Sequence, residues 1–130
     1  MAGHETYPCP ACGFLVFEEP PGSDEICPIC FWEDDLVQLI RTDYAGGANE
    51  PSLIEAQRTF ESIGAVEERL LPFVRKPTAT DERDQSWRRF DATRDPLRAR
   101  VDNDDLGDEA EDPTVYYYWR NVASDSQNDG

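Results

Sequence analysis

The sequence has little positive charge and only one histidine. Its 130 residues include 12 Lys and Arg but 28 Asp and Glu, which gives a formal net charge of -16 at pH 7. Affinity for nucleic-acid backbones comes chiefly from clustered Lys and Arg, so this balance argues against DNA or RNA as the main partner. A basic protein partner is expected instead, because complementary charges steer association.

One segment departs from this balance. The middle of the chain carries six arginines that could form a local basic face: Arg83, Arg88, Arg89, Arg94, Arg98 and Arg100. Acidic residues alternate with them, and such a pattern is typical of a solvated face of mixed charge. The arginines keep a nucleic-acid-associated regulatory role as an alternative.

Long apolar runs are also missing. No stretch approaches the ~18 consecutive apolar residues of a membrane span, and the N-terminal region lacks the cationic start and apolar run of a signal peptide. We therefore expect a cytoplasmic protein with no membrane contact.

Hydrophobic residues make up 38% and charged residues 31% of the chain. Burial of apolar surface alone is marginal at such a composition, so an additional stabiliser such as a metal ion is expected.

The four cysteines form two copies of one local pattern, Cys9-Pro10-Ala11-Cys12 and Cys27-Pro28-Ile29-Cys30. Zinc takes four ligands tetrahedrally, and a tight turn with two thiolates covers one edge of that tetrahedron, so two turns complete it. Between the pairs, a β-prone run, a Pro/Gly breaker and a returning segment predict a hairpin. The sequence therefore predicts a zinc ribbon with a structural Zn²⁺ on Cys9, Cys12, Cys27 and Cys30.

The cysteines are also compatible with chemistry other than a structural zinc. Rubredoxin-type iron has nearly the same ligands, so spacing alone leaves iron as the alternative cofactor. Disulfides require an oxidising compartment, and a redox dithiol uses one pair rather than two. A catalytic zinc keeps an open position, which four cysteines close. His4 is the only histidine and is expected to be solvated.

A helix over residues 52–63 is the clearest regular element. Ser52 and Glu55 have the spacing of a capping box, and Gly64 fits a C-cap. Helical spacing places four apolar residues on one face, which should pack against the ribbon: Leu53, Ala56, Phe60 and Ile63.

The remaining segments complete a predicted small α+β fold, zinc-ribbon or rubredoxin-like. Residues 1–76 form the zinc-ribbon domain, with an apolar strand over Leu36–Ile40. Residues 77–121 form a polar, irregular arm that ends in an aromatic strand, Thr114–Trp119, packed on that domain. Residues 122–130 are predicted to be a disordered tail.

A possible functional surface follows the second cysteine pair. Its residues are Trp32, Glu33, Asp34, Asp35, Asp43, Asn49 and Gln57. The acidic run Glu33–Asp35 is typical of a surface loop, but it could also bind a basic partner or a second cation. A metal-assisted hydrolase using the Trp32–Asp35 loop is therefore a further alternative. No catalytic residue is assigned, because no nucleophile–base pair is identifiable.

Several separated motifs, in this order, resemble the bacterial cysteine-rich CPCC family over about residues 7–65: Tyr7-Pro8-Cys9-Pro10, the run from Cys27 to Asp35, Gly46-Gly47-Ala48-Asn49 and Ser52 to Gln57. Ala11 stands where the family name implies a cysteine, which leaves four ligands. The resemblance implies a bacterial metal-binding module and supplies no activity. The acidic surface favours an interaction module that binds a basic protein over an enzyme, and an inhibitor or immunity-like protein is a narrower version of this hypothesis. No signal in the sequence sets the oligomeric state.

Overall fold

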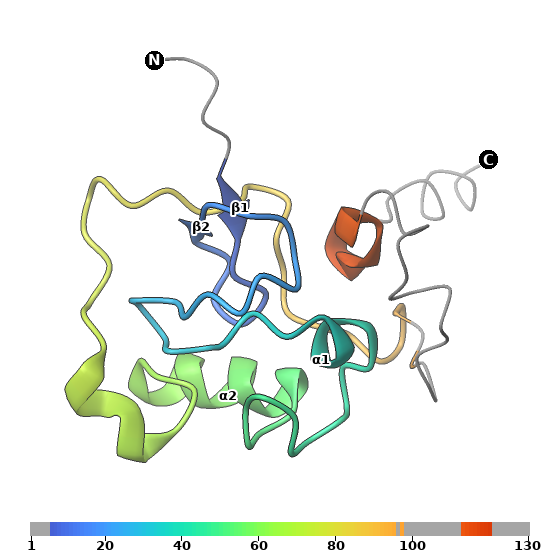
Figure 1. Ribbon diagram of the computed structural model, residues 1–130, viewed down its shortest axis with the longest axis horizontal. Helices are drawn as coiled ribbons and strands as arrows, with labels where there is room; N and C mark the ends of the chain where they lie inside the picture. The colour runs from blue at the N-terminus through green and yellow to red at the C-terminus, as the bar shows by residue number, and fades with distance from the viewer. Residues whose placement is uncertain (1–5, 96, 98–112, 121–130) are drawn as a thin grey trace.

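The computed structural model describes residues 6–95, 97 and 113–120. Strands β1 (Tyr7–Pro8) and β2 (Leu15–Phe17) form an antiparallel hairpin, which confirms a small α+β fold of zinc-ribbon type. In Figure 1 the hairpin lies opposite helix α2, with the intervening loops between them. The other elements are α1 (Leu36–Ile40), α2 (Leu53–Ile63) and the 3-10 helices η1 (Glu68–Phe73), η2 (Pro113–Tyr116) and η3 (Tyr118–Arg120).

Helix α2 confirms the predicted helix and both of its caps. The Ser52 hydroxyl accepts from the Glu55 N–H, the Glu55 carboxylate accepts from the Ser52 N–H, and Gly64 ends the helix at φ 93°. Leu53 and Ala56 are fully buried. Ile63, however, is 39% exposed, so its predicted packing against the ribbon is wrong. The helix packs through its first two turns, and its last turn extends past the core.

The predicted strand over Leu36–Ile40 is wrong, because this segment is α1. The Asp35 carboxylate accepts from the Val37 and Gln38 N–H groups and so caps a first helical turn. Gln38, Leu39 and Ile40 are buried in succession, which a helix against the core allows and an alternating strand with one exposed face does not. The apolar run was informative about burial but not about element type.

The predicted aromatic strand over Thr114–Trp119 is also wrong, because the segment forms η2 and η3. Tyr117, Tyr118 and Trp119 are all buried, and the Tyr117 and Trp119 rings stack at 4.6 Å between centroids. The Tyr118 hydroxyl donates to the Arg88 carbonyl at 2.6 Å. The aromatic rings at the end of the arm thus pack against its earlier part by ring contacts and hydrogen bonds rather than by strand pairing.

The second strand of the ribbon and the C-terminal tail were also predicted from the sequence. The segment predicted to return to the second cysteine pair forms no strand, only an isolated bridge between Ile26 and Glu33. The predicted disordered tail, residues 122–130, lies outside the described residues, as do Arg98 and Arg100. Among the helices that the structure describes, none has the length and apolar character needed to cross a membrane.

Candidate metal centre

The four cysteines meet in one cluster at the centre of the fold. All four are fully buried, and their Sγ atoms lie within 4.8 Å of one another. Two short contacts join the loops, with Cys9 Sγ 3.5 Å from Cys30 Sγ and Cys12 Sγ 3.7 Å from Cys27 Sγ. None of the four forms a disulfide. The expected convergence of the two cysteine pairs is therefore present.

The two cysteine loops share one backbone design. The Gly13 N–H donates to the Cys9 carbonyl at 2.6 Å, and the Phe31 N–H donates to the Cys27 carbonyl at 2.9 Å. Both donor residues have positive φ, 84° at Gly13 and 74° at Phe31. Glycine adopts this conformation freely, whereas Phe31 adopts it at some cost in strain. Each loop thus aims two sulfur atoms toward the same point.

The cluster also fits the geometry of a tetrahedral metal site. A metal–sulfur distance of about 2.3 Å at tetrahedral angles places sulfur atoms about 3.8 Å apart. Two of the sulfur pairs lie at 3.5 and 3.7 Å, and all of them lie within 4.8 Å. Four sulfur donors select zinc or iron over calcium and magnesium, which prefer oxygen. The residues present can therefore hold one metal ion, and the same geometry serves zinc and iron.

Burial and hydrogen bonding give the sulfur atoms different protonation properties. Burial raises the pKa of the Cys9 and Cys30 thiols well above their usual value, and contacts with Cys12 and Cys27 raise it further. Burial also acts to raise the pKa of Cys27. Hydrogen bonds from the Cys12, Cys30 and Cys9 thiols and from the Cys30 N–H nevertheless lower it well below that value. The Ile29 N–H, 3.3 Å from Cys27 Sγ, adds a backbone donor to the same sulfur.

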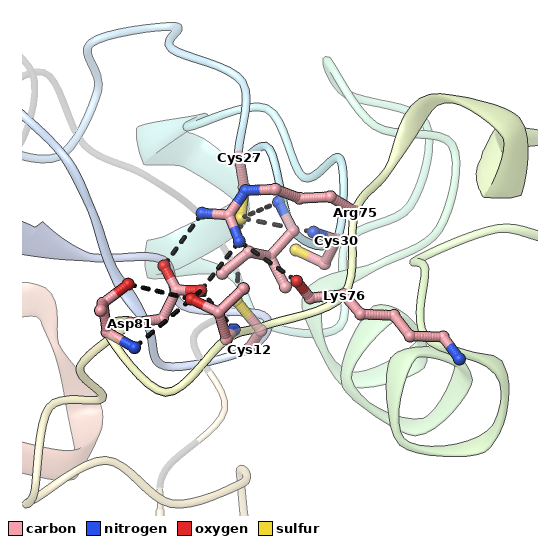
Figure 2. Close-up of polar contacts among 9 residues, drawn as sticks. Cys12, Cys27, Cys30, Arg75, Lys76 and Asp81 are labelled. Carbon is pink, nitrogen blue, oxygen red and sulfur yellow. Dashed lines mark hydrogen bonds and ion pairs between the residues drawn. The ribbon is translucent and has the colours of Figure 1, made fainter.

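Cations beside the cluster come from Arg75, just before the arm, and from Arg83 within it, and sequence reasoning missed them. The Arg75 N–H donates to the Pro28 carbonyl at 3.1 Å, and Figure 2 shows its guanidinium beside Cys27, held by Asp81. The hydrogen bond to Asp81 is the main cause that raises the pKa of Arg75, and the electrostatic effect of Cys27 raises it by less. Arg83 donates from Nε to the Cys12 carbonyl at 2.8 Å. Positive charge that is scarce in the first fifty residues is thus supplied from far along the chain.

The arm also packs directly on the first cysteine loop. The Trp87 indole N–H donates to the Pro10 carbonyl at 3.0 Å. A Cβ atom on Gly13 would lie 2.6 Å from the Trp87 ring, so only glycine allows this approach. Gly13 therefore serves both the turn and the packing of Trp87.

Most residues of the predicted functional surface hold the fold together. Trp32, Asp34, Asn49 and Gln57 are buried. The Asp35 carboxylate caps α1 and accepts from the Ala48 N–H, while the Asn49 side chain pairs with the backbone of Glu33. A hollow of about 180 Å³ includes Glu33 and Asn49 but neither Asp34 nor Asp35 in its lining, and Asp43 is exposed elsewhere. The described structure does not gather these residues into one catalytic pocket.

Asp34 is a buried carboxyl whose protonation should make stability depend on pH. Burial raises its pKa from 3.8 to about 6, against the hydrogen bonds donated by Ser23. The folded state therefore keeps the proton to higher pH than the unfolded state does. This group's contribution to the free energy of unfolding is most favourable below about pH 4 and falls as pH rises to about 6. Asp34→Asn removes the titration, so wild type should lose up to about 3 kcal/mol relative to the variant across that window.

Denaturant unfolding of both proteins with saturating metal at several pH values provides the measurement. Taking the difference between the two proteins cancels the pH dependence of the thiolate ligands, which both share. A difference that does not change with pH would contradict the burial of an ionisable Asp34.

The fold and the cluster together define a class, namely small zinc-ribbon-like α+β proteins whose four cysteines can bind a metal ion. The profile of a family described as Cysteine-rich CPCC matches residues 7–81. The chain belongs to this family, which confirms the resemblance seen in its motifs. The match extends beyond residue 65 and includes Arg75 and Asp81 beside the cluster. Among curated proteins, the search finds no match.

Proposed function

We propose that Cys9, Cys12, Cys27 and Cys30 hold one structural Zn²⁺. The four sulfur atoms are buried and lie within 4.8 Å of one another, and four cysteine ligands on one tetrahedral ion would leave no position for a water or substrate ligand. When bound, the ion would cross-link the two cysteine loops and offset two of the four thiolate charges. A reducing cytoplasm would keep the thiols available to the metal.

A structural role is supported by what the cysteine loops hold in place. The Pro10 carbonyl accepts from Gln57 of α2 at 3.0 Å and from Trp87 of the arm. Arg83 and Arg75 bind carbonyls of the first and second loops, at Cys12 and Pro28. Helix and arm are therefore anchored to the backbone that the ion would fix, and this observation carries the proposal.

Metal analysis tests this assignment. Native mass spectrometry of protein purified from its own host should show one Zn²⁺ per chain. One iron per chain, with the colour of a ferric tetrathiolate, would replace zinc by iron at the same four ligands. Freshly isolated, folded protein without either metal would overturn the proposal.

The protein itself is proposed to be a small acidic interaction module of bacteria, of inhibitor or immunity type, that binds a basic protein. The net charge of -16 supports steering of a basic partner. Acids such as Glu19, Asp43 and Glu50 are exposed, in contrast to Asp34 and Asp35, which serve the fold. The described hollows contain no nucleophile–base pair that would favour an enzyme.

A salt series with a charge variant tests the interaction. Metal-loaded protein should recover a basic protein from host extract at low salt and release it at high salt. A triple variant, Glu19→Gln with Asp43→Asn and Glu50→Gln, should recover less of the same protein. Arg69→Gln is the matched control, because it changes an exposed charge in the opposite direction. Recovery of no partner, or salt-independent binding, would contradict the proposal, and selective recovery of nucleic acid would replace it.

A further inference from the structure

Arg83 is held in place while its outer edge stays free. Its Nε donates to the Cys12 carbonyl at 2.8 Å. Its guanidinium carbon lies 4.6 Å from the Phe14 ring centre and 5.1 Å from that of Trp87. Among the described residues, no group accepts from its two terminal nitrogens. A stacked and anchored guanidinium loses little side-chain entropy when a ligand binds, so Arg83 is preorganised for an oxyanion.

Arg83 faces a hollow that a second arginine shares. This hollow has a volume of about 290 Å³ and is lined by Gln57, Phe60, Glu61, Arg83, Trp87 and Arg89. A smaller hollow of about 120 Å³ shares Gln57 and Arg89 with it and adds Arg58. We call the two together the arginine cleft. Phe60 and Trp87 give its larger part an apolar wall beside the cationic groups.

The charge inside the arginine cleft is opposite to that of the protein. Three arginines line it, and Glu61 is its only acid, which leaves a net charge of 3 - 1 = +2. Glu61 pairs with Arg89 at 2.8 Å, but both side chains are at least half exposed, and such a pair is weak and easily exchanged. An anionic ligand would therefore meet little competition from Glu61.

Tertiary structure creates this imbalance by using the neighbouring acids elsewhere. In the sequence, acids alternate with the central arginines, which predicts mutual neutralisation. In the fold, Asp81 binds Arg75, Asp84 binds Arg120 and Asp95 binds Arg88. Arg83 and Arg58 are left with no ion pair among the described residues. A solvated face of mixed charge does not account for this selective pairing.

We propose that the arginine cleft binds a small aromatic oxyanion, a ring that carries a phosphate or carboxylate group. Arg83 and Arg89 would hold the oxyanion by charge-assisted hydrogen bonds, and the ring would contact Phe60 and the exposed part of Trp87. The size of the larger hollow suits one ring with its charged group rather than an extended chain. This site is distinct from the surface proposed for a basic partner and requires only the folded, metal-loaded protein.

Titration with phenyl phosphate tests the site. In ¹H–¹⁵N spectra of the full, zinc-loaded chain, phenyl phosphate should shift the Trp87 indole and Arg83 Nε signals saturably. The expected dissociation constant is about 1 mM or below. Benzoate should shift the same signals, whereas phenol should not, and inorganic phosphate should bind several-fold more weakly because it lacks the ring. No saturable shift with either aromatic anion, or equal binding of inorganic phosphate, would overturn the proposal.

Variants separate binding from folding. Arg83→Gln and Arg89→Gln should each weaken phenyl phosphate binding about tenfold, the loss expected for one charge-assisted hydrogen bond. Arg83 also supports the Cys12 loop, so Arg89→Gln is the decisive variant, because among the described residues the Arg89 side chain forms an ion pair with Glu61 and no hydrogen bond to either cysteine loop. Arg69→Gln, at a different hollow, should leave binding unchanged. Retained affinity in Arg89→Gln with full zinc content would overturn the proposal without affecting the zinc assignment.

Discussion

Removal of the metal is expected to unfold most of the described chain, including the arm. Structural zinc contributes an apparent ~10–16 kcal/mol in small domains, which is comparable with the whole stability of such a fold. The arm should unfold with the first fifty residues because Arg83 and Trp87 are anchored to the first cysteine loop. A strong chelator should therefore collapse the dispersion of ¹H–¹⁵N signals from both regions, and added zinc should restore it.

Cysteine variants provide the matched comparison. Cys9→Ser and Cys27→Ser remove one ligand from each loop, and both should lose most of the bound metal, with no rescue by added zinc at concentrations that refold wild type. Persistence of native signals from α2 and Trp119 in metal-free protein would show that the core folds without the ion. That result would contradict a structural role for the ion, even if the cysteines bind zinc.

Replacement of Gln38 is expected to give the second-largest loss of stability. This side chain is fully buried. Its Nε2 lies 3.0–3.1 Å from the carbonyls of Tyr44, Asn49 and Pro51, and its Oε1 accepts from the backbone and side-chain nitrogens of Asn49. Gln38→Met keeps the length of the side chain but leaves several buried polar groups unpaired. We expect a loss of about 3–5 kcal/mol, from about 1–3 kcal/mol for each unpaired group.

Denaturant unfolding at one saturating zinc concentration measures this loss, since bound metal shifts apparent stability. Gln85→Met is the matched control, because Gln85 is exposed and its replacement should change stability by less than about 0.5 kcal/mol. A Gln38→Met protein as stable as this control would show that the hydrogen bonds of Gln38 are replaced or unimportant.

Features whose causes lie within a few residues could be predicted from the sequence. The two cysteine loops each depend on four or five consecutive residues, and α2 depends on its own spacing and on caps at Ser52 and Gly64. Segments rich in β-branched or aromatic residues were harder. Leu36–Ile40 is a short apolar run, yet the Asp35 cap and the burial of three successive residues favoured a helix. Thr114–Trp119 has high β-propensity, yet it forms two 3-10 helices with Tyr118 and Trp119 buried.

The sequence by itself determined the family, the four cysteines that can bind a metal ion and the local turns that hold them, because these are properties of short segments. Only the tertiary structure decided which charges meet. It brought Arg75 and Arg83 to the cysteine loops and assigned the arm's acids to particular arginines. Contacts such as that between Pro10 and Trp87 join residues 77 positions apart. No local pattern encodes such a pairing, since it depends on how the whole chain closes around the four cysteines.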